Sequence, residues 1–163
     1  MKTLLRTLLY LALIVWLGAI VFFSITAAVT FQTLQGQSQV AGSIIRQLLH
    51  ILHNMGMVSG VVALALLILA PAWNIYKSRA VLAPMILLLL MLTGTAYSQF
   101  GIIPAMDRDR IDAGNAIDTS DRTNPLNVDF DRLHHRSTNV EGAVLILGLL
   151  TVIFVARAES TRA

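Results

Sequence analysis

The sequence predicts an all-α fold, an integral membrane four-helix bundle, and three observations lead to it. The chain of 163 residues is 56% hydrophobic and only 13% charged, whereas a soluble domain carries about 25% charged residues. Its charged residues separate long apolar runs, each of which could cross a membrane. These runs are rich in Leu, Ala and Ile and lack the alternation of barrel strands, so helices are the expected form.

The four spans follow from where the charges fall. A run without charge covers residues 7–45, but roughly 20 apolar residues are enough for one crossing, and the polar stretch QTLQGQSQ (Gln32–Gln39) should divide it. We expect one transmembrane domain over residues 1–163, with spans at about 8–30, 48–73, 80–103 and 137–156. A polar loop is expected at about 106–136, with a solvated helical extension near its first aspartates.

The N-terminus carries Lys2 and Arg6 ahead of an apolar run, as a signal peptide does. The apolar run of a signal peptide has about 7–15 residues, and the run in this chain is longer. We therefore expect a retained membrane helix and not a cleaved signal.

The distribution of basic residues predicts the orientation in the membrane. Three short segments share the side of the N-terminus, and their only acid is Glu159. Their basic residues are Lys2, Arg6, Lys77, Arg79, Arg157 and Arg162. The other side holds Arg46 and a loop whose five Arg face seven Asp. Because short, basic loops stay inside, we expect both termini in the cytoplasm, and the short loops favour the cell inner (plasma) membrane.

Ionisable residues gather near the membrane face opposite the termini. Spans two and four both begin there, which predicts a polar cluster of Arg46, His50, His53, His134 and Glu141. A carboxylate inside a lipid span is costly and should face the bundle interior. Its expected partner is Arg46 or a histidine at similar depth. The competing interpretation is an interfacial helix start whose polar groups reach to water, with Glu141 in a structural ion pair.

Metal binding is an alternative for three of these residues. His50, His53 and His134 are candidate ligands, since imidazole suits copper, zinc and haem iron. However, the spacing HxxH presents two ligands less well than a spacing of four, and the absence of Cys excludes thiolate sites. We predict no cofactor, with haem or copper as the alternative.

The stretch GMVSG, from Gly56 to Gly60, is a GxxxG pattern, which permits close helix packing in a membrane. We expect it to serve packing within the bundle. The chain lacks GxxxxGK[ST], HExxH, GxGxxG and GxSxG, so ATPase, zincin, Rossmann and serine-hydrolase functions have no support. Its basic residues are scattered and form no aromatic-basic patch, which argues against nucleic acid as a partner.

Two segments carry a resemblance to a known family. VWLGAIVFFS (Val15–Ser24) resembles a Trp-Gly-then-Phe-rich signature, and FDRLHHRSTNVEG (Phe130–Gly142) resembles an F-x-x-L-H-x-x-S segment that leads into a last helix. Together with the order of four helices, they resemble the transmembrane protein 205-like family, a domain of unknown function. The resemblance implies a small four-helix membrane protein without an established biochemical activity.

The resemblance also ranks the histidines. Phe130, Leu133, His134 and Ser137 correspond to recurring positions of the family, which makes His134 the first choice among them. His135 falls where a small residue is more usual, and the His50/His53 pair lies outside the pattern.

Two functions remain open at this level. The first is a non-enzymatic membrane protein that handles an ion or small solute or serves as an accessory subunit, in contact with lipid and as a homo-oligomer or part of a larger membrane complex. It predicts that Glu141 pairs with Arg46. The second is a redox or metal enzyme, which predicts that His50 or His53 faces His134. We favour the first.

Overall fold

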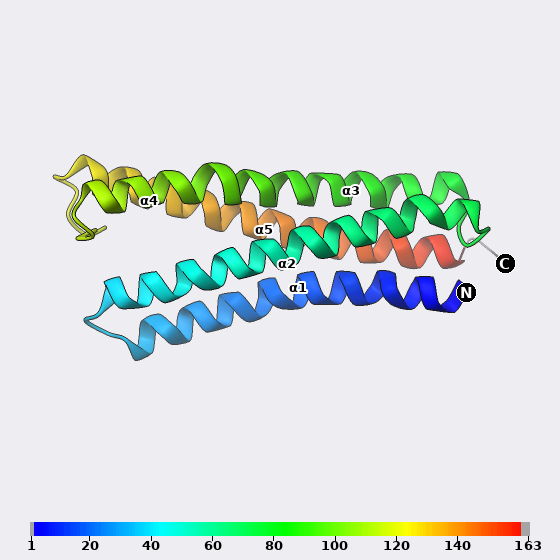
Figure 1. Ribbon diagram of the computed structural model, residues 1–163, viewed down its shortest axis with the longest axis horizontal. Coiled ribbons are helices and arrows are strands. Elements are labelled where there is room, and N and C mark those ends of the chain that lie inside the picture. The colour runs from blue at the N-terminus through cyan, green and yellow to red at the C-terminus, as the bar shows by residue number, and fades with distance from the viewer. Residues whose placement is uncertain (1, 161–163) are drawn as a thin grey trace.

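In a computed structural model, which describes residues 2–160, the chain forms four long helices that lie side by side (Figure 1). Arg162, which was counted for the orientation, lies outside the described residues. The elements are α1 (Lys2–Thr33), α2 (Ser38–Ala72), α3 (Ser78–Tyr97), the π-helical η1 (Ser98–Ile102), α4 (Ile103–Asp112) and α5 (Pro125–Ser160). No strand occurs within residues 2–160. The four-helix prediction is confirmed, because four helical segments are long and apolar enough to cross a membrane.

The helices run farther than the predicted spans. The stretch Gln32–Gln39 does divide the first uncharged run, with a turn in which Gly36 has a φ of 83°, a conformation that favours glycine. Helix α2 starts directly after that turn, ten residues before the expected 48. The segment 106–136, expected as a polar loop, is largely helical, and the connection without helix covers only 113–124.

Local signals explain where the last helix begins. The side chain of Asn124 accepts a hydrogen bond from the backbone N–H of Leu126 at 3.0 Å, and Pro125 occupies the first helical position. Asparagine as a cap followed by proline is a favourable helix start. The helix therefore begins well before its apolar part, and α4 packs against this early segment.

The four long helices form a ring in which the contact between α1 and α5 is the least extensive. Helix α1 packs mainly against α2, α3 packs against α5 and α2, and α1 meets α5 along a thinner seam. Both ends of the described chain lie at one end of the bundle (Figure 1), while the α1–α2 turn and the α4–α5 connection lie at the other.

Close packing at glycines aligns the helices. A Cβ on Gly60 would lie 2.5 Å from Trp16 Cζ3 and 2.7 Å from Leu92 Cδ2, and a Cβ on Gly148 would overlap Leu17. The indole of Trp16 is buried against α2. All five residues lie near the middle of the uncharged run of their helices. Their level along the bundle axis therefore marks the centre of the apolar part of the bundle, and we call it the central level.

Candidate functional site

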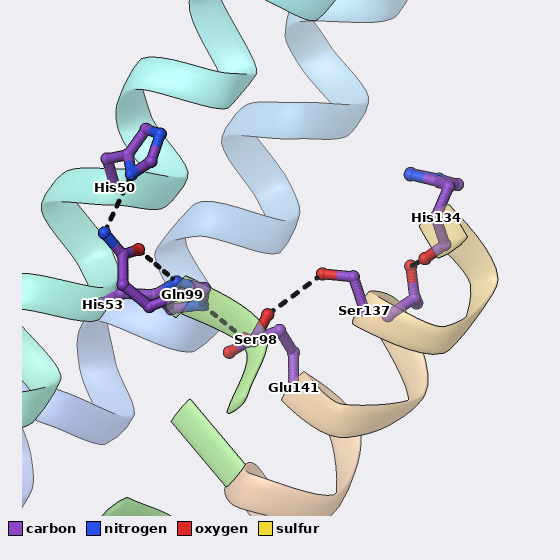
Figure 2. Close-up of polar contacts among 8 residues, drawn as sticks. His50, His53, Ser98, Gln99, His134, Ser137 and Glu141 are labelled. Atoms are coloured by element: carbon purple, nitrogen blue, oxygen red, sulfur yellow. Dashed lines mark hydrogen bonds and ion pairs between the residues drawn. The ribbon is translucent and has the colours of Figure 1, made fainter. Parts of the chain in front are cut away.

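A chain of buried and half-buried polar side chains joins three helices (Figure 2). His53 of α2 is 1% exposed. Its Nε2 lies 2.6 Å from Glu141 Oε1 of α5, and its Nδ1 lies 2.9 Å from Gln99 Oε1 of η1. The Gln99 Nε2 donates to His50 Nδ1 at 3.0 Å. We call these four residues the inner cluster.

The inner cluster lies at hydrocarbon depth. His53, Gln99 and Glu141 are each seven residues from the central level of their own helices, at Gly60, Leu92 and Gly148. Seven residues of helix correspond to about 10 Å, and the hydrocarbon core extends about 15 Å from its centre. In a hydrocarbon core centred on this level, the three side chains lie about 5 Å inside the boundary, on the side of the α1–α2 turn.

The contact between His53 and Glu141 must contain a proton. A distance of 2.6 Å between Nε2 and Oε1 is a short, charge-assisted hydrogen bond. Because His53 Nδ1 faces a carbonyl oxygen, Gln99 Oε1, it carries a proton of its own. A further proton on Nε2 then gives an ion pair, and the same proton on the carboxyl gives a neutral pair. The pair has no net charge in either state, and this lowers the cost of placing it in hydrocarbon.

A secondary polar contact lies beside the inner cluster. The hydroxyl groups of Ser98 and Ser137 are 3.4 Å apart, and both side chains are buried between η1 and α5 (Figure 2). This contact holds α5 against η1 close to Glu141. It helps fix the carboxylate opposite His53.

The structure brings together three of the five residues predicted to cluster. Arg46 is outside it, because its guanidinium pairs with Asp107 Oδ2 at 2.6 Å. The expected Glu141–Arg46 pair is therefore replaced by Glu141–His53. The reason is that α2 and α4 both extend past the apolar region and bring Arg46 next to Asp107.

His134 also stands apart from the inner cluster (Figure 2). Its side chain is exposed, and its backbone carbonyl accepts a bond from Thr138 Oγ1 at 3.1 Å. His134 lies two turns from Glu141 towards the start of α5, while Ser137 and Val144 are the α5 residues that turn inward. The face of α5 that carries His134 and Thr138 therefore points away from the bundle interior.

The predicted metal ligands do not converge. Within residues 2–160, no group of three or more His, Asp or Glu side chains is arranged to hold a metal ion. His50 and His53 are separated by the Gln99 amide, which bonds to both. A haem or copper site would need one of these two histidines to face His134 across the bundle interior. Within residues 2–160, neither does.

Gln99 is the site residue that sequence reasoning missed. A signal for it existed, since it is a long polar side chain within the uncharged run from Ala80 to Met106. The glycines of GMVSG take part indirectly. A Cβ on Gly56 would overlap the Trp16 indole, so this glycine allows α1 to approach α2 one turn from His53.

The opposite end of the bundle holds a second polar group, which we call the terminal cluster. The Tyr76 hydroxyl donates to Glu159 Oε1 at 3.0 Å, and Arg6 Nε lies 3.9 Å from the same oxygen. Burial, together with this bond to Glu159, raises the pKa of Tyr76, which lies in the connection between α2 and α3. Buried apolar side chains separate the two clusters: Leu9, Leu13, Leu67, Leu88 and Val155.

Comparison with known proteins adds a family to this geometry. A family model described as Domain of unknown function (DUF4149) matches residues 11–111, more than half of the chain. The chain belongs to this family. No curated protein and no solved structure matches it.

The DUF4149 match covers one part of the inner cluster. It includes His50, His53 and Gln99, together with the Trp16 contact, and it ends before α5 with Glu141. It also includes the segment Val15–Ser24 but not Phe130–Gly142. The comparisons thus show membership of the DUF4149 family and do not point to the transmembrane protein 205-like family specifically. The four long apolar helices suggest a multi-pass membrane protein.

Proposed function

We propose that this DUF4149 protein is a non-enzymatic protein of the cell inner membrane that binds a proton at hydrocarbon depth. One observation carries the proposal, the 2.6 Å contact between His53 Nε2 and Glu141 Oε1 in a setting where His53 is 1% exposed. No permanently charged side chain joins this pair among the contacts of the described chain. The charge of the pair therefore changes when its proton leaves.

The proton exchanges with one face of the membrane. The Glu141 side chain is 13% exposed and lies on the side of the α1–α2 turn. The apolar layer of Leu13, Leu67 and Leu88 blocks the way to the terminal cluster. With both termini in the cytoplasm, as the basic residues favour, the proton comes from the outer face.

A partner is part of the proposal. Four helices without a broken span in their apolar centre are too few for an alternating-access carrier. The protein therefore binds its proton as an accessory subunit, either of a homo-oligomer or of a larger membrane complex. The segment Phe130–Gly142, at the start of α5, supports the narrower assignment to the transmembrane protein 205-like group.

Proton release from the purified protein tests this function. The protein, in weakly buffered mild detergent, is taken from acid to mildly alkaline pH and the released protons are counted. We expect Glu141→Gln to release about one proton per chain less than the wild type, since the shared proton is gone. Glu159→Gln is the matched control, because it removes the other glutamate, which pairs with Arg6 and Tyr76 and not with a histidine.

Equal release by the wild type and Glu141→Gln would overturn the proposal. The same samples are analysed for metals and by visible spectroscopy. Stoichiometric copper, zinc or haem that is lost in His53→Ala would replace proton binding with metal binding as the function of the site.

A further inference from the structure

Gln99 lies within the π-helical segment η1. Its five residues, Ser98–Ile102, interrupt an otherwise continuous helix from Ser78 to Asp112. Pro104, two residues after the segment, cannot donate to the carbonyl of Phe100 four residues earlier, which disfavours a regular helix there. A π segment adds one residue to a turn, and such segments occur often at functional sites.

The Gln99 amide then determines which ring nitrogens carry protons. A carbonyl oxygen can only accept, so the His53 Nδ1 that lies 2.9 Å from Gln99 Oε1 must be protonated. An amide nitrogen can only donate, so the His50 Nδ1 that lies 3.0 Å from Gln99 Nε2 must be bare. The two histidines are consequently held in opposite tautomers.

We propose that Gln99, placed by the π segment, is the positioning residue that keeps the proton of His53 on Nδ1, so that the exchangeable proton of the site lies between His53 Nε2 and Glu141. This inference rests on the proposed function and deepens it. If Gln99 did not accept from Nδ1, His53 would instead carry its one proton on Nε2 and donate it to a charged Glu141. The site would then hold one proton fewer, because neither Nδ1 of His53 nor the Glu141 carboxylate would carry one.

The same amide separates His50 from the exchange. An amide does not pass protons readily, so a proton on His50 does not reach His53 through Gln99. No charged group of α1 comes near the pair, since α1 has no charged residue after Arg6. On α2 and α4, Arg46 and Asp107 neutralise each other beyond His50. Exchange therefore takes place at Glu141, on the side of the α1–α2 turn.

Two substitutions of Gln99 test the inference by ¹⁵N NMR of histidine-labelled protein in lipid bilayers. In Gln99→Leu, we expect the Nδ1–H signal of His53 to be lost and proton release to move to lower pH. In Gln99→Glu, which keeps the shape, a carboxylate faces both histidines. We therefore expect His50 to change to the Nδ1–H tautomer while His53 keeps its own.

Gln99→Glu keeps the inference testable if Gln99→Leu misfolds. A loss of packing alone would not change the tautomer of His50 and leave that of His53 in place. Gln47→Leu, an exposed glutamine on α2, is the matched control and should leave all signals in place. Unchanged His50 and His53 tautomers in both Gln99 variants would overturn the inference. If Glu141→Gln still removed one proton, the proposed function would stand without it, whereas no effect of Glu141→Gln would remove both.

Discussion

The inner and terminal clusters each contain one of the two glutamates of the chain, and their surroundings differ. Glu141 lies about 10 Å from the central level and faces a histidine. Glu159 is eleven residues from Gly148, or about 16 Å, which places it at the hydrocarbon boundary. Its partners are Arg6 and Tyr76.

The difference shows how depth and partner determine what a carboxylate can do. Arg6 is always charged and lies where water can reach, and the terminal cluster serves to join α1, α5 and the α2–α3 connection. His53 can give up its proton, and Glu141 lies where charge is costly. The inner cluster is therefore suited to binding and release.

The largest expected effect comes from breaking the inner cluster on one side. His53→Leu leaves Glu141 without a partner in hydrocarbon, which should lower the free energy of unfolding by about 3 kcal/mol. Reversible unfolding in mixed micelles measures it. The double variant His53→Leu/Glu141→Leu should recover most of this loss, because no unpaired polar group remains, and a double variant as unstable as the single one would contradict the account.

The packing beside the inner cluster should be nearly as sensitive. Gly56→Ala places a methyl group into the Trp16 indole, and the expected cost is about 1–3 kcal/mol of unfolding free energy. Gly142→Ala is the control, since a Cβ there meets nothing within 4 Å. Equal stability of the two variants, measured in the same micelles, would show that α1 does not approach α2 as described.

The terminal cluster should tolerate substitution better. Glu159→Gln removes an ion pair whose two side chains are each about one third exposed, and exposed pairs contribute about 0.2–1 kcal/mol. We expect a loss within this range in the same unfolding measurement. A loss as large as that of His53→Leu would remove the contrast between the clusters.

The smallest effect concerns the titration of Tyr76. Burial and then the bond to Glu159 raise its pKa above the usual value of about 10. The stability from this bond is thus fully present below pH 10 and is lost as the pH rises through the higher folded pKa. In tyrosinate absorbance, the last step of the titration should be missing in Tyr76→Phe, and a titration curve that keeps this last step in the variant would refute the assignment.

The sequence could predict the four spans because charges and a polar break delimit them, and all four lie where expected. It placed the helix starts too late, because apolarity marks only the lipid-crossing part of a helix. The pair Asn124-Pro125 was a readable start signal for α5. The break at Gln32–Gln39 allowed α2 to begin at once, although its first turns are polar.

The site was predictable in part. Depth along the helices left Arg46 or a histidine as the partner of Glu141, while helical periodicity alone did not distinguish the inner face of α5 from the face of His134. That distinction depends on which helices surround α5 at each level. The role of Gln99 depends on the π segment, and a search limited to ionisable residues passes over an amide.

Carboxyl ¹³C NMR of glutamate-labelled protein in bilayers tests the central claim most directly, since only Glu141 and Glu159 carry the label. The account predicts two distinct signals, because Glu141 shares a proton with His53 whereas Glu159 pairs with Arg6 and Tyr76. The Glu141 signal should move as the shared proton leaves and should change in His53→Leu. Two coincident carboxylate signals that do not respond to pH or to His53→Leu would contradict a shared proton at this site.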